Sequence, residues 1–198
     1  MKKWLIGIDE AGRGPLAGPV AVGVVSVPFD FDWELIPGVG DSKQVAPNRR
    51  EEVFRRAYIM RKQGMLNWRV SMVSSTVIDR KGISYAVRLC ISRGLAALNE
   101  NPKQCEVRLD GLLKAPEKFL HQETIIKGDA SEPVIGLASI LAKVTRDNYM
   151  RKISASPKFS AYEFELHKGY GTKKHRKIIA KIGLSSIHRR SFCSNLLI

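Results

Sequence analysis

Four acidic side chains stand at positions where a metal-assisted reaction could take place. Asp9 and Glu10 directly follow one apolar run, Asp110 follows a second, and Asp129 comes after a third. Carboxylates gathered within a few ångströms raise each other's pKa, and a hard divalent cation relieves that repulsion. Mg²⁺ and Mn²⁺ prefer such oxygen ligands, and two ions about 3.5–4 Å apart can activate a water and stabilise the leaving oxygen in phosphodiester hydrolysis. The acids therefore indicate hydrolysis with Mg²⁺ or Mn²⁺.

Each acid also has a structural alternative. An Asp after a strand is often only a turn residue or a helix cap, and for Asp129 taken alone that interpretation is favoured. Asp147 follows Arg146 in a predicted helix and is expected to be a surface charge or to lie behind the ligands, although it is the other candidate for the fourth carboxylate. Asp9 and Glu10 differ, because two adjacent acids between an apolar strand and a glycine turn are unusual for a solvated face.

A glycine-rich loop, Gly12-Arg13-Gly14, follows the paired acids. Glycines let the backbone come close to a ligand and expose amide N–H groups, and the planar guanidinium of Arg13 suits phosphate. A lone GxG is weak evidence for a ligand-binding loop, but its position directly after the paired acids strengthens that evidence.

Tyr170 is an aromatic residue between glycines on a basic stretch. Lys168, Lys173 and Lys174 stand near it in the chain, which suits a stacking contact on a nucleic-acid surface. An ordinary half-buried loop aromatic is an equally good interpretation from the residues alone.

The elements that must position these residues follow from hydrophobic periodicity. Apolar or alternating runs predict strands at 4–8, 20–27, 66–72, 106–109 and 123–126. Helical spacing predicts helices at 47–61 and 75–98, and a third helix that starts at Ser131 and Pro133 and carries apolar residues up to Val144. A last helix over Lys173–Ile182 stops at Gly183. Gly82 weakens the second helix near its start, which can divide it into two pieces.

The order of these elements predicts the fold class. Three early strands are followed by alternating strands and helices, which indicates an α/β fold with a mixed sheet covered by helices. Asp9, Asp110 and Asp129 each follow the carboxyl end of a predicted strand, the edge where open α/β sheets bind ligands.

The charge balance suggests a polyanionic partner. The 198 residues include 33 Lys and Arg against 19 Asp and Glu, a formal net charge of +14. This excess favours nucleic acid, with an anionic membrane second, although a solvated basic surface would give the same count. Three cysteines without a CxxC indicate neither a disulfide framework nor a zinc site. Without a signal peptide or a span of about 20 apolar residues, a cytoplasmic location is expected.

Several runs together resemble ribonuclease HII, the bacterial branch of the type 2 ribonuclease H family. The longest is GIDEAGRGPLAGP at 7–19. Further runs in family order are DSK at 41–43, LDG at 109–111, KGDA at 127–130, ASILAKVTRD at 138–147, HKGYGT at 167–172 and HRRSF at 188–192. They span nearly the whole chain. The IGL run at 135–137 departs from a usually alanine-rich stretch, which should alter helix packing more than chemistry.

The resemblance implies the ribonuclease H-like fold over residues 1–198 as one domain, with about 155–198 as a helical substrate-binding extension. It implies Asp9, Glu10, Asp110 and Asp129 as ligands of two Mg²⁺ or Mn²⁺ ions. It further implies that Gly12, Arg13 and Gly14 sense the ribose 2′-hydroxyl, that Tyr170 packs on the next deoxynucleotide sugar, and that Lys43 contacts phosphate.

The implied reaction is hydrolysis on the 5′ side of ribonucleotides, in RNA–DNA hybrids and singly embedded in duplex DNA, leaving 3′-hydroxyl and 5′-phosphate ends. The four histidines lie outside the acidic motifs, and His188 is expected in C-terminal packing. A monomer is expected, and the end of the chain, 194–198, shows no convincing sliding-clamp motif.

Two rival interpretations remain. Ribonuclease HIII should carry an extra N-terminal domain and a different pattern after Asp-Glu, whereas this chain starts its first strand at Trp4 and keeps Gly-Arg-Gly. A non-catalytic nucleic-acid-binding protein would explain the charge, but it has no need of clustered acids.

Overall fold

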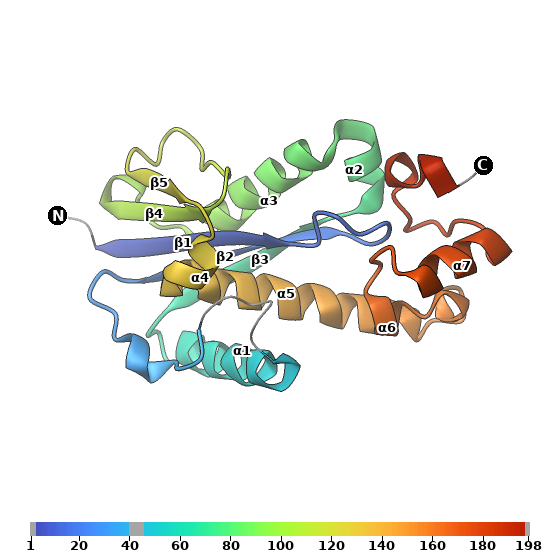
Figure 1. Ribbon diagram of the computed structural model, residues 1–198. Helices are drawn as coiled ribbons and strands as arrows, with labels where there is room; N and C mark the ends of the chain where they lie inside the picture. The colour runs from blue at the N-terminus through green and yellow to red at the C-terminus, as the bar shows by residue number, and fades with distance from the viewer. Residues whose placement is uncertain (1–2, 40–45, 197–198) are drawn as a thin grey trace.

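The computed structural model of the chain describes residues 3–39 and 46–196, in which one five-stranded sheet lies between two layers of helices (Figure 1). The strands are β1 Trp4–Ala11, β2 Val20–Pro28, β3 Asn67–Val73, β4 Cys105–Asp110 and β5 Gln122–Ile125. The helices are α1 Pro47–Lys62, α2 Ser75–Lys81, α3 Ile83–Leu98, α4 Gly128–Ser131, α5 Pro133–Ser154, α6 Phe164–His167 and α7 Lys173–Ile182. Lys43, expected to contact phosphate, lies outside the described residues.

The sheet is mixed, as the element order predicted. Its strand order is β3-β2-β1-β4-β5. β1 pairs antiparallel with β2, and β2 with β3, whereas β4 pairs parallel with both β1 and β5. The carboxyl ends of β1, β4 and β5 therefore lie at the same edge of the sheet, which is the edge where α/β folds bind ligands.

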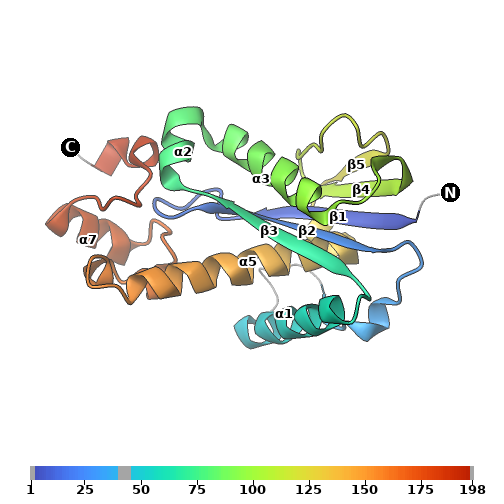
Figure 2. The same cartoon turned by 180° about the vertical axis from the view of Figure 1, so that it is seen from behind.

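Each face of the sheet has its own core. α2 and α3 cover one face with residues such as Val87, Ile91 and Leu95, and α1 and α5 cover the other with residues such as Val53, Ala57 and Leu137 (Figures 1 and 2). Every residue from Val20 to Val27 is buried, because β2 is covered on both sides, and this explains its mostly apolar, valine-rich sequence.

The long helix α5 lies unusually close to β1 and β2. A Cβ atom on Gly7 would lie 2.1 Å from the Val134 carbonyl oxygen, and one on Gly23 would lie 2.2 Å from that of Ala138. Only glycine permits this approach, so the two glycines fix the height of α5 over the sheet. The same approach brings Ser139, one residue further along the helix, to the acids of β1.

A small lobe, residues 155–196, lies at one end of the sheet and includes α6 and α7 (Figure 1). Phe164 and Tyr162 pack on Ala17 and Met150, and Ile179 packs on Leu16. The lobe is therefore built around the turn that joins β1 to β2. No helix in residues 3–39 and 46–196 is long and apolar enough to cross a membrane.

The sequence pattern predicted most ends of the strands and helices to within one or two residues. The weak point at Gly82 does divide α2 from α3, because this glycine has φ of +82° and forms the cap between them. α7 has the predicted bounds, with Thr172 capping its start by accepting a hydrogen bond from the His175 N–H.

Candidate active site

Three of the four predicted acids lie together at the carboxyl edge of the sheet. β1 was expected to end at Ile8, but it continues to Ala11, because Asp9 and Glu10 still pair with β2. The two acids are thus strand residues and do not lie beyond the strand. In the parallel ladder Ile8 is level with Leu109, so Asp9 and Asp110 follow side by side on neighbouring strands.

Asp9 is the most perturbed acid of the group. It is buried, and burial raises the pKa of its carboxyl to about 8. A hydrogen bond with Ser139 on α5 lowers the pKa, and the nearby charges of Glu10 and Asp110 raise it further. The carboxylate also accepts a hydrogen bond from the Glu10 backbone N–H at 2.7 Å. A buried acid of this kind retains its proton until a cation arrives.

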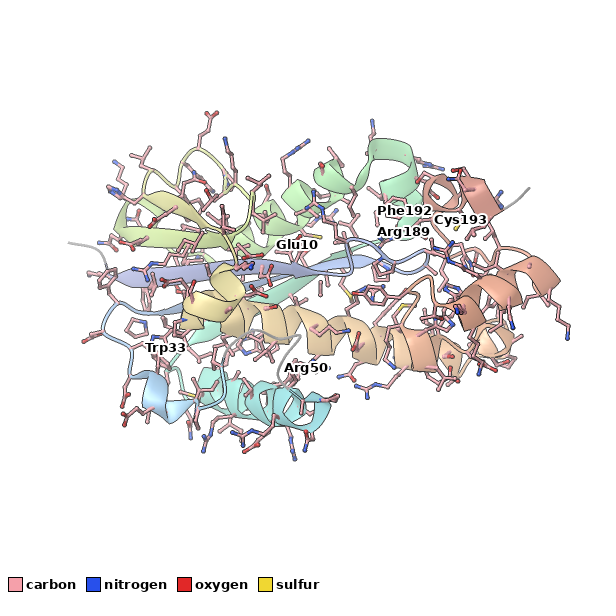
Figure 3. All side chains as sticks on the ribbon, in the orientation of Figure 1. Glu10, Trp33, Arg50, Arg189, Phe192 and Cys193 are labelled. Carbon is pink, nitrogen blue, oxygen red and sulfur yellow. The ribbon has the colours of Figure 1, made fainter. Side chains whose placement is uncertain are left out.

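Glu10 and Asp110 complete an acidic edge. Burial raises the pKa of Glu10, and the guanidinium of Arg13 acts against that shift from 3.4 Å. Oδ1 of Asp110 is buried and has no hydrogen-bond partner among the described residues. Since buried polar atoms are rarely left unpartnered, this oxygen suits a ligand that protein atoms alone do not supply. Figure 3 shows Glu10 on β1 in the middle of the molecule.

The acids open into a cavity of about 220 Å³, here called the acidic cleft. It is lined by Asp9, Glu10, Ala11, Gly12, Arg13, Gly14, Asp110, Ser139, Lys143 and Tyr170. The tertiary structure thus collects the predicted acids, the Gly-Arg-Gly loop and the predicted tyrosine around one space, from segments more than 100 residues apart in sequence.

A second cavity, of about 570 Å³, adjoins the acidic cleft and shares Glu10, Arg13 and Asp110 with it. We call it the side groove. Its other lining residues come from α3 and from the turn after β4: Ser84, Val87, Arg88, Ile91, Gly111, Leu112, Leu113 and Lys114. Arg88 and Lys114 are exposed, so the groove carries positive charge beside the acids.

Asp129 and Asp147, the two candidates for a fourth carboxylate, lie outside the lining of the acidic cleft. Asp129 was expected just past a strand over 123–126; β5 ends at Ile125, and the acid lies buried in the single turn α4. Lys127, with φ of +56°, turns the chain between them. Asp147 forms an ion pair with Lys143 at 2.8 Å and lines a different pocket.

Two buried arginines bind backbone carbonyls of the turn that carries the Gly-Arg-Gly loop. Neither was predicted from the sequence to be a functional residue. Arg189 donates hydrogen bonds to the carbonyl oxygens of Gly12 at 2.7 Å, Arg13 at 2.8 Å and Gly18 at 3.0 Å. Arg146 likewise donates to two carbonyls of the same turn, at 2.8 and 3.1 Å. These carbonyls therefore point toward the buried arginines, while residues 12–14 line the acidic cleft.

Tyr170 lines the acidic cleft together with the acids and is 40% exposed. The Lys143 ammonium and the Arg146 guanidinium each lie 5.7 Å from the centre of its ring. Its neighbour Gly169 accepts a hydrogen bond from the Leu16 N–H at 2.9 Å. The tyrosine is therefore a partly exposed ring fixed to the turn that carries Gly-Arg-Gly, beside two cations, as a stacking surface requires.

The side chains are not arranged as a closed metal cage. Within the described part of the chain, no group of three or more His, Cys, Asp or Glu side chains is placed to hold a metal ion. Mg²⁺ commonly takes only one or two carboxylates and completes its coordination with water and substrate phosphate oxygens. The paired Asp9 and Asp110, with the unpartnered oxygen of Asp110, match that incomplete, all-oxygen kind of site.

Known proteins are similar in sequence to this chain over nearly its whole length. A family model described as ribonuclease HII matches residues 6–195. Ribonuclease HII of Caldicellulosiruptor bescii is 43% identical over 195 residues, which cover 98% of this chain and 89% of that protein.

Solved structures show the same fold at low sequence identity. Ribonuclease HII in a complex with PCNA from Archaeoglobus fulgidus superposes with a TM-score of 0.76 at 24% identity, covering 97% of this chain and 96% of that one. A ribonuclease HIII structure in complex with Mn²⁺ gives a TM-score of 0.73 at 19% identity, covering 99% of this chain and 70% of that one. The sequence matches, spanning nearly the whole chain, show that it belongs to the ribonuclease HII family, and so is a metal-dependent nuclease of the ribonuclease H type.

Proposed function

We propose that this nuclease hydrolyses the phosphodiester on the 5′ side of a ribonucleotide, both in RNA–DNA hybrids and where a single ribonucleotide is embedded in duplex DNA. The products are a 3′-hydroxyl and a 5′-phosphate. The observation that carries the proposal is the acidic cleft, in which acids, the Gly-Arg-Gly loop and Tyr170 line one space. A nuclease that cut any RNA strand would need the acids but not a separate element for the sugar that follows the ribose.

Asp9, Glu10 and Asp110 would hold the metal, and we assign Asp129 as a fourth, more distant carboxylate. The donors are all carboxylate oxygens, which favours Mg²⁺ or Mn²⁺ over softer ions. When two such ions are bound, they supply an activated water and neutralise charge at the leaving oxygen. The pairing of β1 with β4 holds Asp9 and Asp110 side by side, and Ser139 orients Asp9 by hydrogen bonding.

The Gly-Arg-Gly loop and Tyr170 would read the sugars. The 2′-hydroxyl distinguishes RNA from DNA, and a loop of glycines lets the backbone approach it closely. Tyr170 presents a partly exposed ring for the next sugar, while Lys143 and Arg13 line the same cleft and suit the phosphates between them. The residues proposed for ribose recognition and the acids thus line one cavity.

The side groove extends this path beyond the acids. Because it shares Glu10, Arg13 and Asp110 with the acidic cleft, a strand that crosses the acids enters the groove. Arg88 and Lys114 would neutralise its backbone, and the net charge of +14 supports binding of the rest of the duplex.

The test is cleavage of three end-labelled duplexes: one with a single ribonucleotide, one RNA–DNA hybrid and one of DNA only. Each is incubated with Mg²⁺, with Mn²⁺ or with a chelator. We expect one metal-dependent cut 5′ to the single ribonucleotide, many cuts in the hybrid and none in DNA. Cleavage of the hybrid alone would contradict the junction specificity. If neither the single-ribonucleotide duplex nor the hybrid is cleaved, the proposed substrates are wrong.

A further inference from the structure

The C-terminal segment 185–189 lies between the two elements assigned above to sugar recognition. Its backbone joins the turn after β1: the Arg189 N–H donates to the Leu16 carbonyl at 2.7 Å, and the Gly18 N–H donates to the Ile187 carbonyl at 2.9 Å. His188 also forms a β-bridge with Ala17. Main-chain hydrogen bonds thus fix this segment to the turn that carries the Gly-Arg-Gly loop.

A chain of side-chain hydrogen bonds connects the same segment to Tyr170. Nδ1 of His188 accepts from the Ser185 N–H at 2.8 Å, so the proton of the neutral ring is on Nε2. That Nε2–H faces Nε2 of His175 at 3.0 Å, which must accept. His175 therefore carries its proton on Nδ1, from which it donates to the Tyr170 carbonyl at 2.9 Å.

The chain requires neutral rings, and the surroundings favour them. His175 and His188 are buried, and burial is the main cause that lowers the pKa of each to about 4. His167 stacks on His175 with ring centres 4.0 Å apart. It accepts from the Gly169 N–H at 3.2 Å and contacts the Tyr162 carbonyl at 2.9 Å. Every ring nitrogen of the three histidines thus has a partner, and the protons have one consistent arrangement.

Arg189, the residue next to His188, makes the matching connection on the other side. Its guanidinium donates to the carbonyls of Gly12 and Arg13. Figure 3 shows Arg189 at the lobe end of the molecule, toward which the turn after β1 extends. Two consecutive residues therefore hold two separate loops: His188 reaches Tyr170 through His175, and Arg189 reaches the Gly-Arg-Gly loop.

We propose that His188 and Arg189 are positioning residues that set the distance between the Gly-Arg-Gly loop and Tyr170, and thereby give the enzyme its preference for an RNA–DNA junction. This inference rests on the proposed function, since it assigns the two loops to adjacent sugars. A long hybrid has a ribose at every position of its RNA strand, so it can bind in many registers. Its cleavage should therefore tolerate a displacement of Tyr170 relative to the Gly-Arg-Gly loop. A single embedded ribonucleotide offers one register only, so a displacement of about 1 Å is enough to lower the rate by up to about 100-fold.

Two substitutions of His188 separate positioning from mere packing. His188→Asn places an amide near the position of Nδ1, which keeps the Ser185 bond but cannot reach His175. His188→Gln places its amide near Nε2, which keeps a donor to His175. His121→Asn is the matched control, because His121 is exposed and outside the cluster.

The readout is the ratio of kcat/KM for the single-ribonucleotide duplex to kcat/KM for the hybrid, with folding checked by thermal melting. We expect His188→Asn to lower this ratio about 10-fold or more, His188→Gln to restore most of it and His121→Asn to leave it unchanged. Equal losses on both substrates, or no advantage of Gln over Asn, would overturn the inference. If the wild type itself shows no junction cleavage, the proposed function fails instead.

A measurement on the unmodified protein keeps the inference testable should the variants fold poorly. Long-range ¹H–¹⁵N NMR spectra report which ring nitrogen of each histidine carries the proton. We expect Nε2–H for His188 and Nδ1–H for His175 at neutral pH. A proton on Nδ1 of His188, or a charged ring, would break the chain to Tyr170 and overturn the inference.

Discussion

Asp9 lies buried in β1 with two other acids nearby, and its burial has an energetic cost. The pKa of Asp9 rises to about 8, mainly through burial. Between the ordinary value near 4 and this raised value, the folded state therefore binds more protons than the unfolded state. By linkage, the stability of the metal-free protein must fall as the pH rises through that window, by up to about 1.4 kcal/mol for each pH unit.

Asp9→Asn is expected to abolish cleavage while stabilising the metal-free fold. Activity should fall by more than about 100-fold. Substituting a residue that only hydrogen-bonds to a metal ligand typically lowers metal affinity or activity by 10–100-fold, and loss of a ligand itself should cost more. The melting temperature in chelator should rise, and the rise should be larger at pH 8 than at pH 5, since the amide has no proton to lose. The measurements are cleavage of the hybrid and thermal melting at both pH values.

The control for this substitution is Asp30→Asn, which changes an exposed acid on the turn after β2. It should leave both activity and melting temperature nearly unchanged. Normal cleavage by Asp9→Asn would show that Asp9 is not a ligand. A melting difference independent of pH would show that the carboxyl is not protonated in the folded, metal-free state.

Metal binding should release a proton from this site at neutral pH. Because Asp9 retains its proton up to about pH 8, a cation must displace it, and the apparent affinity for Mn²⁺ should rise as the pH increases from 6 to 8. Calorimetric titration in buffers of different ionisation enthalpy measures the number of protons released. An affinity that does not change over this range would contradict the raised pKa.

At the scale of the elements, the turn from β1 to β2 is held by side chains distant in sequence. Arg146 comes from α5 and Arg189 from the C-terminal lobe, and both bind carbonyls within residues 12–19. Gly12 lies directly over Arg146 with φ of +85°. The shape of the loop is thus decided jointly by a left-handed glycine and by two buried cations beneath it.

Gly12→Ala and Gly14→Ala should therefore differ sharply. A Cβ on Gly12 would lie 2.0 Å from Nε of Arg146, whereas one on Gly14 meets nothing within 4 Å. We expect Gly12→Ala to lower the free energy of unfolding by about 1–3 kcal/mol, as a strained backbone does, and Gly14→Ala to change it by less than about 0.5 kcal/mol. Urea denaturation of both variants decides this, and equal effects would contradict the account of the loop.

At the scale of the whole molecule, the proposed active site lies where the sheet and the C-terminal lobe meet. The sheet edge supplies the acids, and the lobe supplies Tyr170 and the histidine cluster, which consists of His167, His175 and His188. Asp79 on α2 also accepts hydrogen bonds from the Arg190 and Ser191 N–H groups, at 2.9 and 3.1 Å. The geometry of the proposed site therefore depends on how firmly the lobe is docked.

The histidine cluster should make that docking sensitive to acid. The folded pKa of His175 is lowered to about 4, below the unfolded value near 6.5, so the unfolded state binds more protons between these values. By linkage, its contribution to stability is complete above about pH 6.5 and is lost progressively down to about pH 4. Urea denaturation from pH 7 to 4 measures this for the wild type and for His175→Gln, which has no titrating ring.

The wild type should lose more stability than His175→Gln over that pH range, because carboxylates titrate in both proteins but the ring titrates only in one. Parallel curves would show that His175 is not kept neutral by burial. The same comparison with His121→Gln should show no difference from the wild type, since His121 is exposed.

The sequence by itself determined what depends on near neighbours. The apolar runs and helical spacing predicted the mixed sheet, the break at Gly82 and the bounds of α7, because each depends on residues a few positions apart. The paired acids Asp9 and Glu10 were recognisable from their place after an apolar strand. The motifs, read together, identified the family that the sequence comparisons confirmed.

Only the tertiary structure decided what depends on distant partners. β1 runs through Asp9 and Glu10 because β2 still pairs with them, and no local signal marks that extension. Arg189 donates hydrogen bonds to carbonyls up to 177 residues away in the sequence. The three histidines form no recognisable motif in the sequence, and only the folded lobe brings them together. Their roles arise from burial and hydrogen bonding across the fold, and periodicity along the chain carries no information about either.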